Sequence, residues 1–142
     1  MTTEPLYING EFVQALATAT LDVIDPATTD VIGRVPDASA ADVDLAVRAA
    51  RTAFDAVPWR DATAQDRGRV LFKLAQIVRD RADELAEIET RNNGKPIVES
   101  EFDIADVATC FEYYGGLATK IHGDVLPVPD NAISLAMREP IG

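Results

Sequence analysis

Apolar positions follow two different spacings, and the change between them falls near residue 39. Within residues 7–13, Asn9-Gly10 separates two short apolar stretches. This dipeptide favours a tight β-hairpin turn because both residues tolerate positive φ. A proline-containing polar segment separates the β-branched stretches 21–24 and 31–35, which predicts a second hairpin. The first 35 residues are therefore expected to form β-hairpins.

From Ser39 onward the apolar residues recur with helical spacing. Ser39 and Thr63 each precede an aspartate by three positions, which is the arrangement of a capping signal. We predict a first helix that Pro58 ends, and a second helix whose apolar face continues, unbroken or as a separate turn, to a stop at Gly94. A third helix is expected over residues 98–122. The predicted apolar faces comprise Val43, Val47, Ala50, Phe54 and Val57; Val70, Leu71, Leu74, Ile77 and Val78, with Leu85 and Ile88 beyond; and Phe102, Ile104, Ala108, Phe111, Leu117 and Ile121.

Two glycines interrupt the third predicted helix. Gly115 and Gly116 each cost about 1 kcal/mol relative to alanine inside a helix. The pair is therefore expected either to permit close packing or to mark a local irregularity.

The C-terminal segment returns to an alternating pattern. Pro127 and Pro129 enforce extended backbone, and Ile133, Leu135 and Met137 alternate with smaller or polar residues, as in a β-strand. No later strand follows in the chain, so we expect this strand to present an unpaired apolar edge.

Composition narrows the class of protein. The 142 residues are 47% hydrophobic and 26% charged, as in one soluble globular domain, and the formal net charge is −11. This charge repels nucleic acid and anionic lipid, and no apolar run is long enough to cross a membrane. A single cysteine excludes an internal disulfide, and residues 1–5 lack signal-peptide character. A cytoplasmic location is expected.

Candidate catalytic residues are few. Cys110 and His122 are the only cysteine and histidine. They lie twelve residues apart in one predicted helix, about 18 Å along its axis, which excludes a catalytic pair. Cys110 lies between Ala108 and Phe111, so we interpret it as a small buried residue, and His122 as a helix-end residue near the negative end of the dipole.

Two other polar motifs have simple structural explanations. The acidic cluster of Glu99, Glu101, Asp103 and Asp106 fits a solvated helix start, where carboxylates complement the helix dipole. Residues 93–96, Asn-Gly-Lys-Pro, fit a helix stop. No glycine-rich phosphate motif is present.

Several segments, in order and spacing, resemble the aldehyde dehydrogenase superfamily. They cover the whole chain, and each is weak when taken alone. Residues 91–96 and 113–114 resemble most closely the betaine-aldehyde and aminoaldehyde dehydrogenases. The matching segments are 7–13, 23–28, 31–35, 42–54, 59–60, 67–71, 93–96, 113–116 and 138–142.

The resemblance implies an α/β fold, the N-terminal part of the aldehyde dehydrogenase fold, with β-hairpins, then three or four helices, then a final oligomerisation strand. Residues 1–123 would be the N-terminal portion of the coenzyme-binding domain, and residues 124–142 the start of an oligomerisation hairpin. The parent would be a homo-oligomer, dimer or tetramer, that oxidises an aldehyde to a carboxylic acid with NAD or NADP.

In the family the catalytic groups and the main coenzyme contacts lie beyond the segment that matches residues 138–142. No catalytic or cofactor-binding residue is therefore assigned here, and the chain alone is expected to be inactive. An alternative interpretation is a stand-alone acidic interaction or oligomerisation module without enzymatic activity.

One minor site is implied by the resemblance. Some relatives bind a monovalent cation through backbone carbonyls at the positions of Val23 and Ile24 and an acidic side chain at that of Asn92. Because Asn92 is neutral, the site is expected to be weakened. The family's Asn-Pro is Asp25-Pro26 here, which preserves the turn chemistry.

Overall fold

The chain begins with a β-hairpin in the computed structural model, which describes residues 3–56, 59–129 and 131–141. β1 (Leu6–Ile8) pairs with β2 (Glu11–Val13) in antiparallel fashion. In the connecting turn Asn9 and Gly10 have φ angles of 56° and 84°, as a two-residue hairpin turn of this kind requires. The first predicted hairpin is therefore confirmed.

A second hairpin follows, also as predicted. β3 (Thr20–Ile24) pairs with β4 (Val31–Pro36), and the register shifts between Val23 and Ile24. Such an irregularity leaves backbone groups outside the regular ladder and increases the local twist. The chain start is attached to this hairpin, because the backbone amide of Glu4 donates to the carbonyl of Arg34 at 2.9 Å.

The first helix, α1 (Ala40–Asp55), begins at the predicted capping box. Ser39 Oγ accepts from the backbone amide of Asp42, and the carboxylate of Asp42 accepts from the amide of Ser39. The same carboxylate accepts the amide of Leu16 at 2.9 Å, so it fastens the preceding loop to the helix start. The predicted end at Val57 and Pro58 lies outside the described residues.

The next apolar face is divided between two helices. α2 (Ala64–Asp80) is capped by Thr63, whose Oγ1 accepts from the backbone amide of Asp66 at 3.1 Å. The helix is interrupted at Arg81, so Leu85 and Ile88 belong to a separate helix, α3 (Ala82–Asn93). Gly94 ends α3 in the left-handed conformation, with φ of 81°, as predicted.

The long helix α4 (Ile97–Leu117) is followed by a 3₁₀ turn, η1 (Ala118–Lys120), and is therefore shorter than the predicted helix over 98–122. Its two glycines have different surroundings. A β-carbon on Gly68 of α2 would lie 2.8 Å from the carbonyl oxygen of Gly115, so the two backbones touch at this point. A β-carbon on Gly116 would meet nothing within 4 Å. Close packing therefore explains Gly115 but not Gly116.

A small core lies between α2, α3 and α4. It comprises the buried residues Ala75, Val78 and Ala108, with Leu85, Ile104 and Phe111 packed against them. The prediction that Phe102 and Ile121 are buried is wrong, since they are 72% and 62% exposed. Phe102 precedes Ile104 by two positions, which places it on nearly the opposite side of the helix. Ile121 lies beyond the end of the helix and outside its periodicity.

The final strand is paired along one edge, which corrects the expectation that it has no partner; within the described residues its other edge is unpaired. β6 (Ser134–Ala136) pairs with β5 (Asp124–Leu126), a strand that the sequence pattern did not reveal. At the base of this hairpin a β-carbon on Gly123 would lie 2.2 Å from the carbonyl oxygen of Ala136. Only glycine allows this approach.

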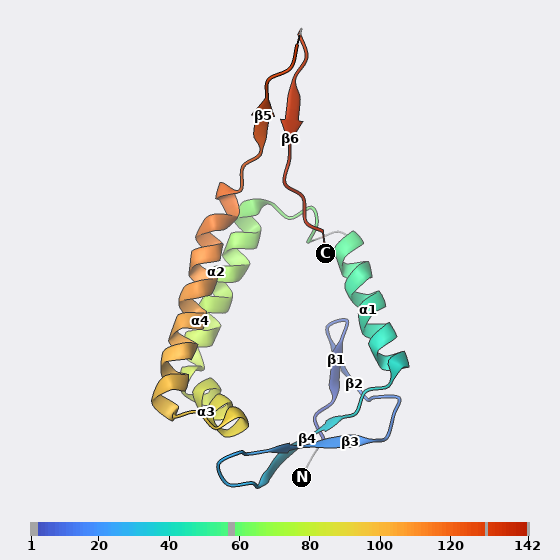
Figure 1. Cartoon of the computed structure of the whole chain (residues 1–142), viewed down its shortest axis with the longest axis vertical. Coiled ribbons are helices and arrows are strands. Elements are labelled where there is room, and N and C mark those ends of the chain that lie inside the picture. Colours follow the sequence, from blue (N-terminus) through green and yellow to red (C-terminus); the bar gives the residue numbers. More distant parts are fainter. Residues whose placement is uncertain (1–2, 57–58, 130, 142) are drawn as a thin grey trace.

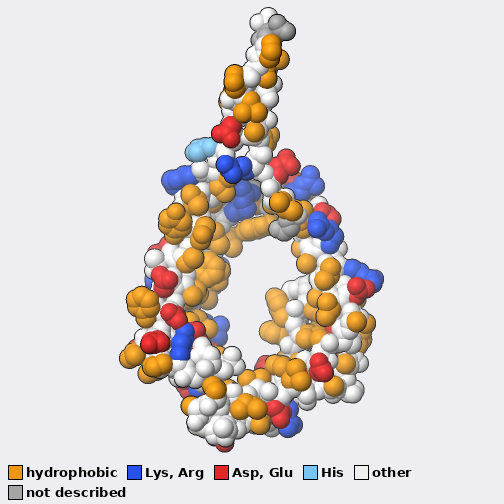
Figure 2. Space-filling model, viewed as in Figure 1, with side chains coloured by type: hydrophobic (Ala, Val, Ile, Leu, Met, Phe, Trp, Pro, Cys, Tyr) orange, Lys and Arg blue, Asp and Glu red, His pale blue; other side chains and the backbone are white. Residues whose placement is uncertain are grey.

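The elements form an open ring from which the β5–β6 hairpin projects (Figure 1). The α2–α4 pair forms one side and α1 the other, with the β3–β4 hairpin across the base. Hydrophobic side chains line much of the hollow centre (Figure 2). The apolar face that the sequence predicts for α1 is not buried, since Val43 and Val47 are 55% and 61% exposed. Within the described residues no helix is long and apolar enough to cross a membrane.

Candidate functional site

The turn between β3 and β4 carries two of the three predicted cation-site residues, Val23 and Ile24. Asp25, which follows them, is buried, and its Oδ1 accepts from the backbone amides of Ala27 at 2.8 Å and Thr28 at 3.4 Å. These contacts are those of an Asx turn, so aspartate supplies the turn chemistry expected of this position. The carboxylate is therefore occupied with its own backbone.

The third predicted residue, Asn92, lies exposed in the last turn of α3. Two positions later the backbone of Gly94 lies against the ring of Pro26, because a β-carbon on Gly94 would be 2.7 Å from Pro26 Cγ. The end of α3 and the β3–β4 turn are thus in contact. This contact brings together the two segments that carry Val23, Ile24 and Asn92.

Lys95 links the same corner to α4. Its ammonium is paired with Glu89 of α3 at 2.5 Å and with Asp103 of α4, and its side chain is only 21% exposed. The hydrogen bond that Lys95 donates to Asp103, followed by the one that it donates to Glu89, raises the pKa of Lys95. The helix-stop interpretation of residues 93–96 is therefore incomplete, because Lys95 also connects two helices.

Cys110 and His122 are placed apart from this corner. Cys110 is exposed on α4, so the interpretation of a small buried residue is wrong. It lies two positions after Ala108, which faces the core, and so points in nearly the opposite direction. His122 lies beyond η1 rather than at a helix end, and its carbonyl accepts from Arg138 Nε at 3.2 Å.

The acidic cluster at the start of α4 provides no metal centre. Asp103 is paired with Lys95, and Glu99 lies in the first turn of the helix. In the described ranges no group of three or more histidine, cysteine, aspartate or glutamate side chains is arranged to hold a metal ion. The predicted cation site would instead be built from backbone carbonyls, those of Val23 and Ile24.

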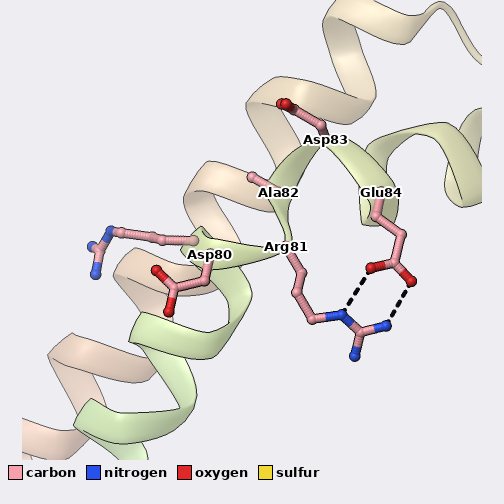
Figure 3. Close-up of a pocket in the computed structure, with 6 residues that line it drawn as sticks. Asp80, Arg81, Ala82, Asp83 and Glu84 are labelled. Atoms are coloured by element: carbon pink, nitrogen blue, oxygen red, sulfur yellow. Dashed lines mark hydrogen bonds and ion pairs between the residues drawn. The ribbon is translucent and has the colours of Figure 1, made fainter.

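A polar notch lies at the junction of α2 and α3 (Figure 3). Arg81 donates to both carboxylate oxygens of Glu84, through Nε at 2.9 Å and Nη2 at 2.6 Å. Arg79, which also lines the notch, pairs with Glu112 of α4 at 2.5 Å. Both guanidinium groups are thus bound to carboxylates of the chain, and the notch is best explained as a helix junction.

An apolar pocket of about 230 Å³ lies between α2, α4 and the segment that precedes α2. Arg67 closes one side, with Nη1 donating to the carbonyl of Ala62 at 2.5 Å. Sequence reasoning missed this pocket, because its aromatic residues come from distant segments without a shared spacing. It is lined by Trp59, Arg67, Leu71, Tyr114, Leu117, Ala118 and Ile121.

Comparisons with known proteins agree on one family. The family described as "Aldehyde dehydrogenase family" matches residues 12–142. "Aldehyde dehydrogenase family 2 member B4, mitochondrial" of Arabidopsis thaliana is 44% identical over 138 residues, which are 96% of this chain and 26% of the relative.

Solved structures show the same similarity. The crystal structure of PnpE in complex with nicotinamide adenine dinucleotide matches with a TM-score of 0.91 and 45% identity, covering 97% of this chain and 28% of that one. A betaine aldehyde dehydrogenase of Staphylococcus aureus in complex with NAD⁺ matches with a TM-score of 0.85 and 34% identity, over 90% of this chain and 26% of that one. The chain thus spans little more than a quarter of the length of these relatives.

Proposed function

Because this chain belongs to the aldehyde dehydrogenase family, we propose that it is the N-terminal part of an enzyme that oxidises an aldehyde to a carboxylic acid with NAD or NADP. The observation that carries the proposal is the match over nearly the whole chain, at a TM-score of 0.91, to a structure that holds NAD. The match spans only 28% of that structure. The reacting groups are proposed to lie in the remainder.

The described residues support a scaffolding role. Residues 1–123 would be the N-terminal portion of the coenzyme-binding domain, and residues 124–142 the start of the oligomerisation hairpin. In support, the ring is lined with apolar side chains, and the hairpin is apolar and projects from it (Figure 2). A homo-oligomer, dimer or tetramer, is part of the proposal. The comparisons give no support to a stand-alone interaction module.

Two finer expectations remain proposals. A cytoplasmic location is consistent with the absence of any membrane-spanning helix in the described ranges, although the Arabidopsis relative is named mitochondrial. The second expectation concerns the class of aldehyde. The sequence of residues 91–96 and 113–114 favours betaine-aldehyde relatives. The chain as a whole, however, is 34% identical to the betaine aldehyde dehydrogenase and 45% identical to PnpE.

A chimera tests the proposed function. The chain would replace the matching segment of the S. aureus betaine aldehyde dehydrogenase, and NADH formation would be followed with betaine aldehyde. We expect the chimera to be active, whereas this chain alone and the S. aureus enzyme without the segment should be inactive. Activity of the chain alone would contradict the proposed location of the reacting groups. A folded, NAD-binding chimera without activity would contradict the proposed role of the chain.

We also propose a weak monovalent cation site at the carbonyls of Val23 and Ile24, near Asn92. The contact between Pro26 and Gly94 and the strand irregularity between Val23 and Ile24 support it. Restoring an acidic group in Asn92→Asp should increase the rise in melting temperature that potassium chloride produces over choline chloride. Asn131→Asp, on the β5–β6 loop, is the matched control. Equal responses of the two variants would exclude the site.

A further inference from the structure

The three lysines of the chain have different surroundings, and the proposed oxidation uses none of their amines. Lys95 is held between two carboxylates and is largely covered. Lys120 is exposed, and its Nζ donates to the carbonyl of Gly116. Lys73 is exposed on α2, and within the described ranges no carboxylate lies within ion-pair distance of its amine.

We propose that Lys73 is the lysine of this chain that aldehydes modify first, and that Glu89 and Asp103 shield Lys95 from the same reaction. The biological relevance rests on the proposed function, which would expose the protein to aldehydes. The reactivity order itself rests on the surroundings of each amine.

The chemistry needs no further reactant. The unprotonated amine attacks the carbonyl carbon, and a carbon–nitrogen bond forms. The carbonyl oxygen leaves as water together with the two hydrogens of the amine, which leaves an imine. Only the unprotonated, accessible amine can take this path. Arginine stays protonated and therefore does not compete.

The neighbours of Lys73 explain why its amine is not paired. On a helix, ion-pair partners lie three or four positions apart, and at these positions around Lys73 α2 carries Arg69, Val70, Gln76 and Ile77, none of them acidic. Across the helix interface, Glu112 is paired with Arg79. Lys73 therefore has no acidic neighbour on its own helix at pairing distance, and it is exposed to solvent.

Lys95 has the opposite surroundings. Two carboxylates from different helices accept from its ammonium, and only about a fifth of its side chain is accessible, at 21%. Its raised pKa, caused first by the Asp103 hydrogen bond, lowers the fraction of free amine. Both effects slow attack on an aldehyde.

Reductive trapping tests the order in which the three lysines react. The chain would be incubated with butanal and cyanoborohydride, which converts each imine into a stable secondary amine, and each lysine would be quantified by peptide mass spectrometry. We expect Lys73 to react fastest and Lys95 slowest, roughly fivefold apart, the factor that corresponds to an ion pair of ordinary strength. In concentrated urea the three rates should converge.

Two pairs of substitutions test whether the carboxylates cause the difference in rate between Lys73 and Lys95. Glu89→Gln combined with Asp103→Asn should accelerate Lys95 toward the rate of Lys73. Glu99→Gln combined with Asp106→Asn removes the same charge from other positions and should leave Lys95 slow. Equal rates for Lys73 and Lys95 in native buffer, or no response of Lys95 to the first pair, would overturn the proposal. Because trapping involves no turnover, an inactive chimera would remove the proposed function without changing this result.

Discussion

The α2–α4 pair, α1 and the β5–β6 hairpin all carry apolar residues, yet among these described elements buried apolar residues are found in the helical pair and not in α1 or the hairpin. Gly68 and Gly115 bring two helix backbones into contact, and Ala75 and Ala108, about two turns along the helices from them, are fully buried. In contrast, Val47 of α1 is 61% exposed and Val125 of the hairpin 76%. An apolar pattern therefore indicates which face of an element needs a partner, but not whether these 142 residues contain that partner.

The largest expected effect is at the helix contact. Gly68→Ala would place a methyl group 2.8 Å from a backbone oxygen, which cannot move aside as a side chain can. The helices must separate, and the free energy of unfolding should fall by about 1–3 kcal/mol. Gly116→Ala, in the same helix pair but in open space, should be neutral or stabilising by up to about 1 kcal/mol. Urea unfolding followed by helical circular dichroism measures both.

If Gly68→Ala were as stable as Gly116→Ala, the close contact of α2 and α4 would be refuted. The comparison between the packed and the open part of the molecule would then lose its basis.

Acidification is expected to have an intermediate effect, which is to weaken the first turn of α1. Hydrogen bonds from Ser39 and then from the amide of Leu16 lower the pKa of Asp42 below its ordinary value of 3.8. The stabilisation is therefore complete above that value and is lost as the pH falls through the lower folded-state pKa. Hydrogen exchange of the first turn of α1 should rise over this range in the natural chain. Asp42→Asn should show faster exchange at neutral pH and a weaker acid dependence.

The core of α2, α3 and α4, where Ala75 and Ala108 are fully buried, provides the comparison for this titration, since the hydrogen bonds of Asp42 join α1 to the preceding loop. A parallel loss of protection in that core would mean that acid unfolds the whole chain rather than α1.

The smallest effect on overall stability is expected at the hairpin. Gly123→Ala would place a β-carbon 2.2 Å from the carbonyl oxygen of Ala136, so β5 and β6 cannot pair as they do. Because the hairpin projects away from the ring, helix unfolding should change by less than about 0.5 kcal/mol (Figure 1). Nuclear magnetic resonance of Val125 and Leu135 would report the lost pairing. A large drop in helix stability would show that the hairpin is coupled to the ring.

Local signals in the sequence predicted much of the fold. Asn9-Gly10, Ser39, Thr63 and Gly94 each act through their own backbone or that of near neighbours, and each is found where the pattern placed it. The order of hairpins, helices and a final strand was likewise predictable. The alternative of a separate α3 was open, since a helix interruption at Arg81 has no glycine or proline signal.

Features that depend on distant contacts were not predictable. β5 is three residues long and carries no alternation of its own, so only its pairing with β6 defines it. The exposure of Cys110 depends on which side of α4 meets α2. At the candidate site, the Asx turn of Asp25 followed from residue type, whereas the contact of Pro26 with Gly94 and the ion pairs of Lys95 required the assembled fold.

The contact between Gly68 and Gly115 also has a consequence for the order of synthesis. A ribosome makes α2 first, then α3, and only then the part of α4 that carries Gly115. During that interval the apolar face of α2 has no α4 to cover it, and exposed apolar surface on a nascent chain invites aggregation or chaperone binding. Leu85 of α3, which packs against the same core, is the first cover to emerge.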